Sequence, residues 1–260
     1  MGWLERDGVA LFYEEAAGEG TPFLFVHGIA CDHTHLTPQF EHFERLGHRV
    51  VSVDLRGHGQ SAAPEADYTM ELFTDDLAWS CGQLGLEKPI LVGHSLGGEV
   101  SLALAAAFPD LPSAIVLMDS TIMPPRERTD TMRPYIESLR TLAYPDELRS
   151  YFSSRLFLPT DDAERKERIL EAAPFTPQHV VASAWEDGFF VYDTAAAAAA
   201  CTVPTLYIDA GTPNTNLERF GELCPQLVIG RTVGAGHFIQ LEVPDQVNAM
   251  IERFLEVSGI

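Results

Sequence analysis

The sequence predicts an α/β fold, in which a mostly parallel sheet has helices on both faces and carries a helical insertion. Short, nearly continuous apolar runs alternate with stretches of helical spacing, as parallel strands covered on both faces require. From residue 120 to residue 204 the strand pattern stops, and helix-like segments separated by prolines replace it. The chain has 260 residues, of which 46% are hydrophobic, a composition typical of one packed globular domain.

The predicted strands are short apolar runs. In chain order they are Val9 to Glu15, Pro22 to Val26, Arg49 to Val53, Pro89 to Val92, Ala114 to Met118, Thr205 to Ile208 and Val228 to Val233. The third run ends at Asp54 and the fifth ends at Asp119. Because stretches with helical spacing separate successive runs, most of the strands are expected to be parallel.

The insertion is predicted to be helical. Its segments are Met132 to Leu142, Glu147 to Phe157, Asp162 to Ala172 and Pro177 to Trp185. The alanine run from Ala195 to Ala200 is expected to form a short helix before the next strand, because alanine has the highest helix propensity. We therefore expect a core of residues 1–120 and 203–260 and a helical cap of residues 121–202.

The charge of the chain excludes some classes of partner. Acidic side chains outnumber basic ones by 38 to 17, which gives a formal net charge of -21. At long range this charge repels the phosphates of nucleic acids and the surfaces of anionic lipids. We expect neither a nucleic acid nor a membrane as a partner, and we interpret the acidity as a solvating surface.

The lack of a recognisable secretory signal and the spacing of the cysteines both predict a cytoplasmic location. Acidic residues interrupt the apolar runs of residues 1–15, which therefore lack the layout of a secretory signal, and no apolar stretch reaches the length of a membrane span. The four cysteines are widely spaced and form no C-x-x-C pair. Reduced thiols are expected rather than a zinc site or a disulfide framework, and the predicted location is cytoplasmic.

The motif that carries chemistry is Gly93-His94-Ser95-Leu96-Gly97. It follows a predicted strand and precedes a helical pattern from Glu99 to Phe108, the context that a G-x-S-x-G turn requires. Glycines on both sides of the turn let the chain reverse sharply and expose the hydroxyl of Ser95, the candidate nucleophile. The amide of Leu96, at the positive end of the helix, is a candidate donor to an oxyanion.

A serine hydroxyl needs a base and a second oxyanion donor. His237 lies in a glycine-containing loop after the last predicted strand and before a terminal amphipathic helix, Pro244 to Val257, and is the candidate base. The amide of Ile29, just past the strand that ends at His27-Gly28, is the candidate second donor. His33 and His35 have H-x-H spacing without an evident third ligand, so no metal site is expected.

With these motifs in place, the chain resembles the α/β-hydrolase superfamily over nearly its full length. The loop from Asp54 to Ser61, which often follows the second parallel strand of that fold, is part of the resemblance, and we interpret Asp54 and Arg56 as structural. The place where the family usually carries its triad acid falls here on Pro213 or Asn214. Asp209 is the nearby alternative, but it lies close to the strand end.

A variant of the family carries the carboxylate after the preceding strand, where this chain has Asp119. In this respect the chain resembles haloalkane dehalogenases, zearalenone-type lactonases and cofactor-independent quinolone dioxygenases. Asp119 is therefore the predicted acid, with a structural capping role as its alternative. Dehalogenases need an aspartate nucleophile where this chain has Ser95, and the dioxygenases have a second histidine where it has Leu96.

The resemblance implies hydrolysis of a hydrophobic ester or lactone through an acyl-enzyme, without a metal or an organic cofactor. Met123 and Trp185 are the predicted substrate-binding residues. The aromatic residues expected to enrich the cap are Phe152, Phe157, Trp185, Phe189, Phe190 and Tyr192. A carbon-carbon bond hydrolase, a cofactor-free dioxygenase and a non-enzymatic ligand receptor are the open alternatives. The oligomeric state is also open, with a homodimer as one option.

Overall fold

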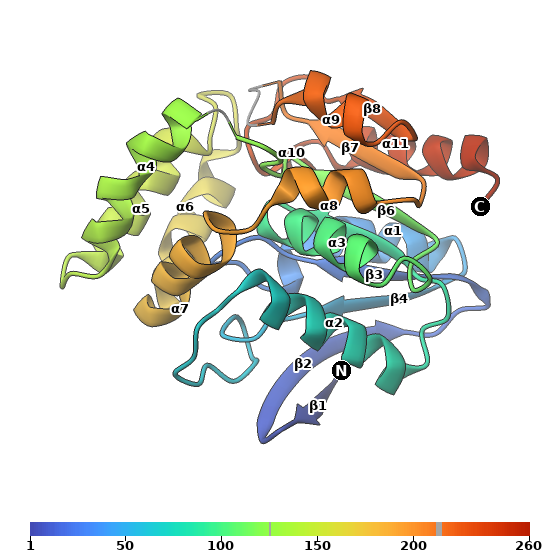
Figure 1. The fold of residues 1–260 in the computed structure, drawn as a ribbon, viewed down its shortest axis with the longest axis horizontal. Helices are drawn as coiled ribbons and strands as arrows, with labels where there is room; N and C mark the ends of the chain where they lie inside the picture. Colours follow the sequence, from blue (N-terminus) through green and yellow to red (C-terminus); the bar gives the residue numbers. More distant parts are fainter. Residues whose placement is uncertain (125, 212–214) are drawn as a thin grey trace.

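The computed structural model describes residues 1–124, 126–211 and 215–260, apart from the side chains of residues 126–131. These residues form an eight-stranded sheet in the order β1-β2-β4-β3-β5-β6-β7-β8 (Figure 1). The strands are β1 Gly2–Arg6, β2 Val9–Ala16, β3 Gly20–Val26, β4 His48–Val53, β5 Ile90–His94, β6 Ala114–Met118, β7 Thr205–Asp209 and β8 Leu227–Arg231. Strands β3 to β8 pair in parallel, which confirms the predicted α/β fold.

The edge strand β1 was absent from the sequence prediction. It pairs antiparallel with β2 through a two-residue turn, Asp7-Gly8, in which both residues have positive φ (52° and 78°). Aspartate followed by glycine favours such a turn because its geometry matches the twist of a hairpin. At the other edge, β8 ends at Arg231, two residues before the predicted end, and the amide of Thr232 makes a last hydrogen bond to the carbonyl of Asp209 in β7.

Helices cover both faces of the sheet. Helices α1 Thr37–Arg45 and α11 Pro244–Ser258 pack on one face, whereas α2 Met70–Leu84, α3 Leu96–Ala107 and α8 Thr194–Ala200 pack on the other. The central strand β6 serves both layers. Val116 and Met118 pack on the side of α1 and α11, whereas Ile115 and Leu117 pack on the side of α2, α3 and α8. This alternation is what a strand buried on both faces requires.

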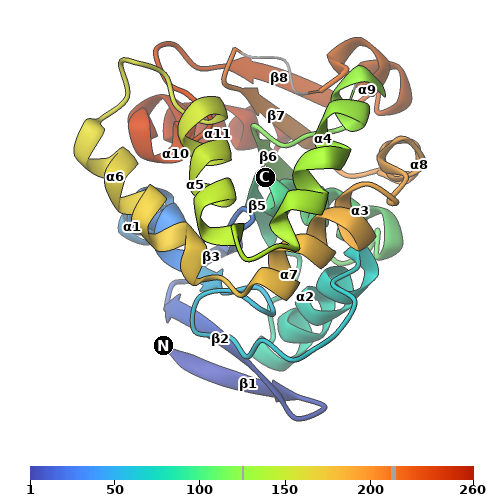
Figure 2. The same ribbon diagram turned by 90° about the vertical axis from the view of Figure 1, so that its left-hand side faces the viewer.

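Between β6 and β7 the chain is helical. The insertion contains α4 Arg126–Leu139, α5 Tyr144–Arg155, α6 Ala163–Ala172 and α7 Gln178–Ser183, and a π-helical turn, Ala184–Phe189, extends α7. Figures 1 and 2 show α4 to α7 grouped beyond one end of the sheet, while α8 returns to lie beside α3. The exact boundaries of a separate cap, at residues 121 and 202, remain a prediction.

The remaining short helices are α9 Leu217–Leu223, α10 Ile239–Glu242 and the 3₁₀ turns η1 His33–Leu36 and η2 Ala173–Phe175. Helix α10 follows the loop that contains His237, and η1 follows the loop that contains Ile29. In the part of the chain that the structure describes, no helix combines the length and the apolarity that crossing a bilayer would take.

The two-sided burial of β6 leads to a stability prediction. Leu117→Ala is expected to lower the free energy of unfolding by about 2–5 kcal/mol, because Leu117 is fully buried and the neighbouring layers cannot close the cavity. Leu142→Ala, at a fully exposed side chain, should change it by less than about 0.5 kcal/mol. Urea denaturation followed by circular dichroism measures both values, and equal values for the two variants would contradict the assigned core.

Candidate active site

Ser95 lies at the sharp turn between β5 and α3. Its backbone has φ 52° and ψ -121°, a left-handed conformation that a non-glycine residue rarely adopts. The amide of Ser95 donates to the carbonyl of Met118 at 2.9 Å, so the end of β6 helps to hold the turn. This strained turn leaves Ser95 partly accessible, at the wall of a cavity.

The glycines beside Ser95 allow close backbone contacts. A Cβ atom on Gly93 would lie 2.2 Å from the carbonyl oxygen of Gly97, and one on Gly97 would lie 2.1 Å from that of Val26. Neither distance is compatible with a side chain, since both neighbours are backbone atoms. The turn therefore packs directly on the end of β3, as the sequence motif predicts.

The predicted base and acid are in direct contact. Nδ1 of His237 donates to Oδ2 of Asp119 at 2.6 Å, and the two side chains are 11% and 2% exposed. The second carboxylate oxygen of Asp119 accepts from the amide of Ala210 at 3.2 Å. Asp119 has φ 44°, which turns its backbone away from β6 immediately after the strand. The contact engages Nδ1 of His237, so Nε2 is the remaining nitrogen of the ring.

Asp209, the alternative acid, is engaged elsewhere. Its carboxylate accepts from Nε and Nη2 of Arg231 at 2.8 and 2.6 Å and from the amide of Gly211 at 2.9 Å. These contacts hold the end of β7 to β8. Positions 213 and 214, where the family usually carries the acid, lie outside the described residues. Of the two aspartates, Asp119 is the one that contacts His237.

The loop after Asp119 is braced by β7. Tyr207 Oη donates to the carbonyl of Ser120 at 2.6 Å, and the hydroxyl of Thr215 donates to the same carbonyl at 2.7 Å. Burial, with the nearby charge of Asp119 as a further cause, raises the pKa of Tyr207, so its hydroxyl stays protonated and can donate. The sequence prediction did not include this brace.

His94 also contributes to the site, although sequence reasoning assigned it no role. Its Nε2 atom donates to the carbonyl of His237 at 3.0 Å, and the two rings lie 4.6 Å apart. Burial lowers the pKa of His94 well below its ordinary value, and the neighbouring His237 lowers it further. His94 is therefore neutral and holds the backbone of His237. Its position inside the G-x-S-x-G motif was the available sequence signal.

The amide of Ile29 is oriented by the contacts of the carbonyl on the same peptide. That carbonyl, of Gly28, accepts from Nδ1 of His27 at 2.7 Å and from the amide of Cys31 at 3.3 Å. In a planar trans peptide the N–H points opposite to the C=O, so the amide of Ile29 faces away from these donors. Ile29 lines the same cavity as Ser95.

The amide of Leu96 is oriented in the same way. The carbonyl of Ser95 accepts from the amides of Gly98 and Glu99 at 2.9 and 3.3 Å, inside the first turn of α3. The N–H of Leu96 therefore points toward the N-terminal end of α3, where the first amides have no carbonyl one turn earlier in the helix. A helix N-terminus also favours negative charge. Ile29 and Leu96 thus both line the cavity that Ser95 lines, and their role as oxyanion donors stays a prediction.

The cavity above Ser95 has a volume of about 60 Å³ and mainly apolar and aromatic walls. The residues that line it are Ile29, Ser95, Leu96, Glu99, Thr121, Pro124, Met132, Tyr151, Phe152, Leu156, Trp185, Phe189, Phe190 and His237. Trp185 is on the wall, as predicted. Met123 is not among the described residues that line it; its backbone has φ 51° and its amide donates to Thr194 Oγ1. Phe157 stacks on Phe238 instead.

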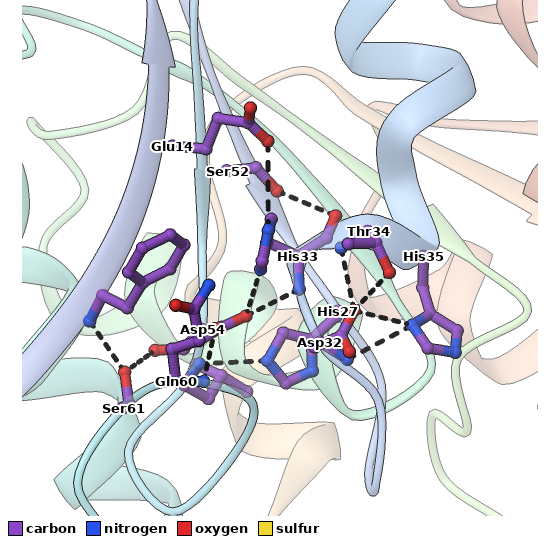
Figure 3. Close-up of polar contacts among 12 residues, drawn as sticks. Glu14, His27, Asp32, His33, Thr34, His35, Ser52, Asp54, Gln60 and Ser61 are labelled. Atoms are coloured by element: carbon purple, nitrogen blue, oxygen red, sulfur yellow. Dashed lines mark hydrogen bonds and ion pairs between the residues drawn. The ribbon is translucent and has the colours of Figure 1, made fainter. Parts of the chain in front are cut away.

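A buried polar network supports the loop of Ile29 (Figure 3). Nε2 of His27 accepts from the amide of Leu55 at 3.0 Å, which leaves its Nδ1 proton for the carbonyl of Gly28. Burial lowers the pKa of His27, although the charge of Asp54 opposes the shift. A neutral imidazole with this tautomer fixes the peptide that carries the Ile29 amide.

The H-x-H histidines are part of the same network. Nδ1 of His33 contacts Asp54 at 2.8 Å, and Nδ1 of His35 contacts Asp32 at 3.2 Å (Figure 3). Burial opposes the charged form of His35, yet Cys31 and Asp32 raise its pKa to about 10. Across the described parts of the chain, no three histidine, cysteine or acidic side chains are arranged to hold a metal ion. Both histidines are instead bound to carboxylates.

Comparison with known proteins agrees with this geometry. The model of a family described as the alpha/beta hydrolase fold matches residues 21–244. The chain belongs to the α/β-hydrolase family. This hydrolase is 26% identical to the (E)-2-((N-methylformamido)methylene)succinate hydrolase of Acinetobacter baylyi over 262 residues, which cover 98% of the chain and 97% of that protein.

Solved structures resemble the hydrolase over nearly its whole length. A thermophilic esterase from Thermogutta terrifontis is 28% identical with a TM-score of 0.82, and the match covers 96% of this chain and 94% of that one. An enol-lactonase from Burkholderia xenovorans LB400 is 23% identical with a TM-score of 0.84, and the match covers 98% and 99% of the two chains. At that lower identity the likeness supports the fold alone.

The close contact at Gly97 gives a test of the turn. Gly97→Ala is expected to lower the free energy of unfolding by about 3 kcal/mol, because its Cβ atom would meet the carbonyl oxygen of Val26. Gly82→Ala is the matched control, since Gly82 lies in α2 with open space around it. This substitution should raise the free energy of unfolding by up to about 1 kcal/mol, because alanine favours a helix more than glycine does. Thermal or urea denaturation measures both. Stabilisation of the protein by Gly97→Ala would contradict the described turn.

Proposed function

We propose that this hydrolase cleaves a small, hydrophobic carboxylic ester or lactone through an acyl-enzyme on Ser95. The observation that carries the proposal is the 2.6 Å hydrogen bond between His237 and Asp119 at the cavity that Ser95 lines. A serine hydroxyl is a weak nucleophile unless a positioned base removes its proton, and a carboxylate on the other ring nitrogen fixes the tautomer of that base.

In the acylation step, Oγ of Ser95 attacks the carbonyl carbon of the substrate while Nε2 of His237 accepts the hydroxyl proton. The negative charge that develops on the carbonyl oxygen is stabilised by the amides of Ile29 and Leu96. The resulting imidazolium is stabilised by Asp119, 2.6 Å from Nδ1. His237 then gives its proton to the leaving oxygen, and the carbon-oxygen bond of the ester breaks.

In the deacylation step, water attacks the acyl group on Ser95, and Nε2 of His237 accepts a proton from that water. The same two amides stabilise the second oxyanion. Collapse of this intermediate returns the proton to Oγ of Ser95 and releases the carboxylic acid. A lactone follows the same steps, except that its leaving oxygen remains attached to the acyl chain.

The walls of the cavity favour an apolar acyl group. Trp185, Phe189, Phe190 and Phe152 come from the helical insertion and cover the side of the cavity opposite the sheet. These walls offer an apolar acyl group mainly hydrophobic and aromatic contacts. The relationship to the Thermogutta esterase supports the ester class.

A second candidate is hydrolysis of the amide bond in an (acylamino)methylene succinate, favoured by the relationship to the Acinetobacter enzyme. The carboxylate of Glu99 lies on the cavity wall and accepts from the amide of Thr121 at 3.1 Å. The mainly apolar walls of the cavity suit a neutral substrate better than one with two carboxylates, and we therefore place the neutral ester first. Purified protein tested against neutral esters, lactones and (acylamino)methylene succinates distinguishes the two candidates.

The serine has the simplest test. Ser95→Ala should lower the release of nitrophenol from short p-nitrophenyl esters by at least about 1000-fold, because the variant has no hydroxyl to acylate. Ser154→Ala is the control, since Ser154 is exposed on α5 and should leave the rate unchanged. Undiminished turnover in Ser95→Ala would refute the acyl-enzyme.

The two aspartates can be separated by matched substitutions. Asp119→Asn should lower kcat by about 10⁴-fold, because an amide favours the wrong tautomer of His237. Asp209→Asn should leave kcat nearly unchanged and lower the melting temperature instead, because it weakens the contact with Arg231. Steady-state kinetics and thermal denaturation of both variants check this. The opposite pattern of rates would move the acid to β7.

A further inference from the structure

The helical insertion holds the backbone of His237. The amide of His237 donates to the carbonyl of Leu156 at 2.8 Å, just beyond the end of α5. Its carbonyl accepts from His94 Nε2 at 3.0 Å, on the core side. The peptide groups on both sides of this residue are therefore anchored to different parts of the molecule.

A buried carboxylate joins the same two segments. Oδ1 of Asp161 accepts from the amide of Gly236 at 3.2 Å, and Oδ2 accepts from the amide of Leu158 at 2.8 Å. The amide of Asp161 in turn donates to the carbonyl of Leu158 at 3.1 Å, which closes the turn between α5 and α6. Asp161 is only 9% exposed. One carboxylate thus shapes this turn and binds the residue before His237.

The approach of the two segments is too close for a side chain at position 236. A Cβ atom on Gly236 would lie 2.6 Å from Oδ2 of Asp161 and 2.7 Å from the carbonyl oxygen of Leu156. Because Gly236 has no side chain, its backbone can approach both the carboxylate of Asp161 and the backbone of Leu156.

Further contacts join the insertion to the residues that follow His237. Phe157 stacks on Phe238, with ring centroids 5.3 Å apart and an interplanar angle of 26°. The amide of Asp162 donates to Glu242 at 3.1 Å, and Arg165 forms an ion pair with the same carboxylate at 2.7 Å. The segment from Leu156 to Arg165 thus contacts the segment from Gly236 to Glu242 at several points.

We propose that Asp161 is a positioning residue for the reaction, which fixes the loop of His237 from the insertion and couples the base to the cover of the cavity. This inference rests on the proposed function, in which His237 is the base. Asp161 does not line the cavity, whereas Leu156, which binds the amide of His237, does. A shift of this turn therefore displaces the base and the cavity wall together.

The test compares Asp161→Ala with Asp162→Ala. The first substitution leaves the amides of Gly236 and Leu158 without their acceptor. The second removes the side chain that caps α6 by accepting from the amide of Arg165, while it leaves the contacts of Gly236 intact. Both variants loosen the insertion, but only the first releases the loop of His237. Asp161→Asn, which keeps the size of the side chain and one acceptor oxygen, is the substitute if Asp161→Ala does not fold.

Asp161→Ala should lower kcat for p-nitrophenyl acetate by about 100-fold, with KM changed by less than about threefold, because a base displaced by about 1 Å acts poorly. The pH at half-maximal kcat should shift in this variant. Asp162→Ala should show neither effect. Equal losses of kcat in both variants, or unchanged kcat and pH profile in Asp161→Ala, would overturn the proposal.

Proton NMR provides a readout without turnover. The Nδ1 proton of His237, bound to Asp119, should give a low-field resonance that His237→Gln lacks. This resonance should persist in Asp162→Ala and disappear or broaden in Asp161→Ala. If the wild type hydrolyses no ester and the resonance still depends on Asp161, the proposed function fails and the positioning role stands. If the resonance is the same in wild type and Asp161→Ala, the positioning role fails whatever the activity.

Discussion

The hydrogen bond between Nδ1 of His237 and Asp119 joins two loops that are distant in the sequence, and the rest of the site depends on it. Asp119 reaches it through a left-handed turn directly after β6, and the amide of Ala210 occupies its other oxygen. The adjacent strand β5 is followed by Ser95, so Ser95 and Asp119 both lie at the carboxyl ends of neighbouring parallel strands. The parallel order of β5, β6 and β7 therefore determines which carboxylate His237 can contact.

Buried neutral histidines and backbone amides complete this arrangement. His27 and His94 are both uncharged because burial lowers their pKa, and each uses one ring proton to bind a carbonyl of a loop at the site. The amides of Ile29 and Leu96 are oriented because the carbonyls of their peptides are already bound. In the proposed reaction, side chains move the proton while fixed peptide groups stabilise the negative charge, at little cost of reorganisation.

Much of this could be predicted from the sequence because the responsible patterns are local. The buried strand runs and the G-x-S-x-G turn are contiguous, and the resemblance to relatives with an early acid directed attention to Asp119. Contacts made by folding were not predictable. Asp161 lies in no motif, and its partner Gly236 is 75 residues away. Met123, predicted to bind substrate, is not among the described residues that line the cavity, and its amide donates to Thr194 at the start of α8, 71 residues away.

A crystal structure with a phenylboronic acid tests the account most directly, because a boronate on serine mimics the tetrahedral intermediate. We predict a bond from Ser95 Oγ to boron, one boronate oxygen about 2.7–3.1 Å from the amides of Ile29 and Leu96, and His237 still bound to Asp119. A boronate that leaves Ser95 unmodified, or a His237 ring turned to another carboxylate, would contradict the assigned site.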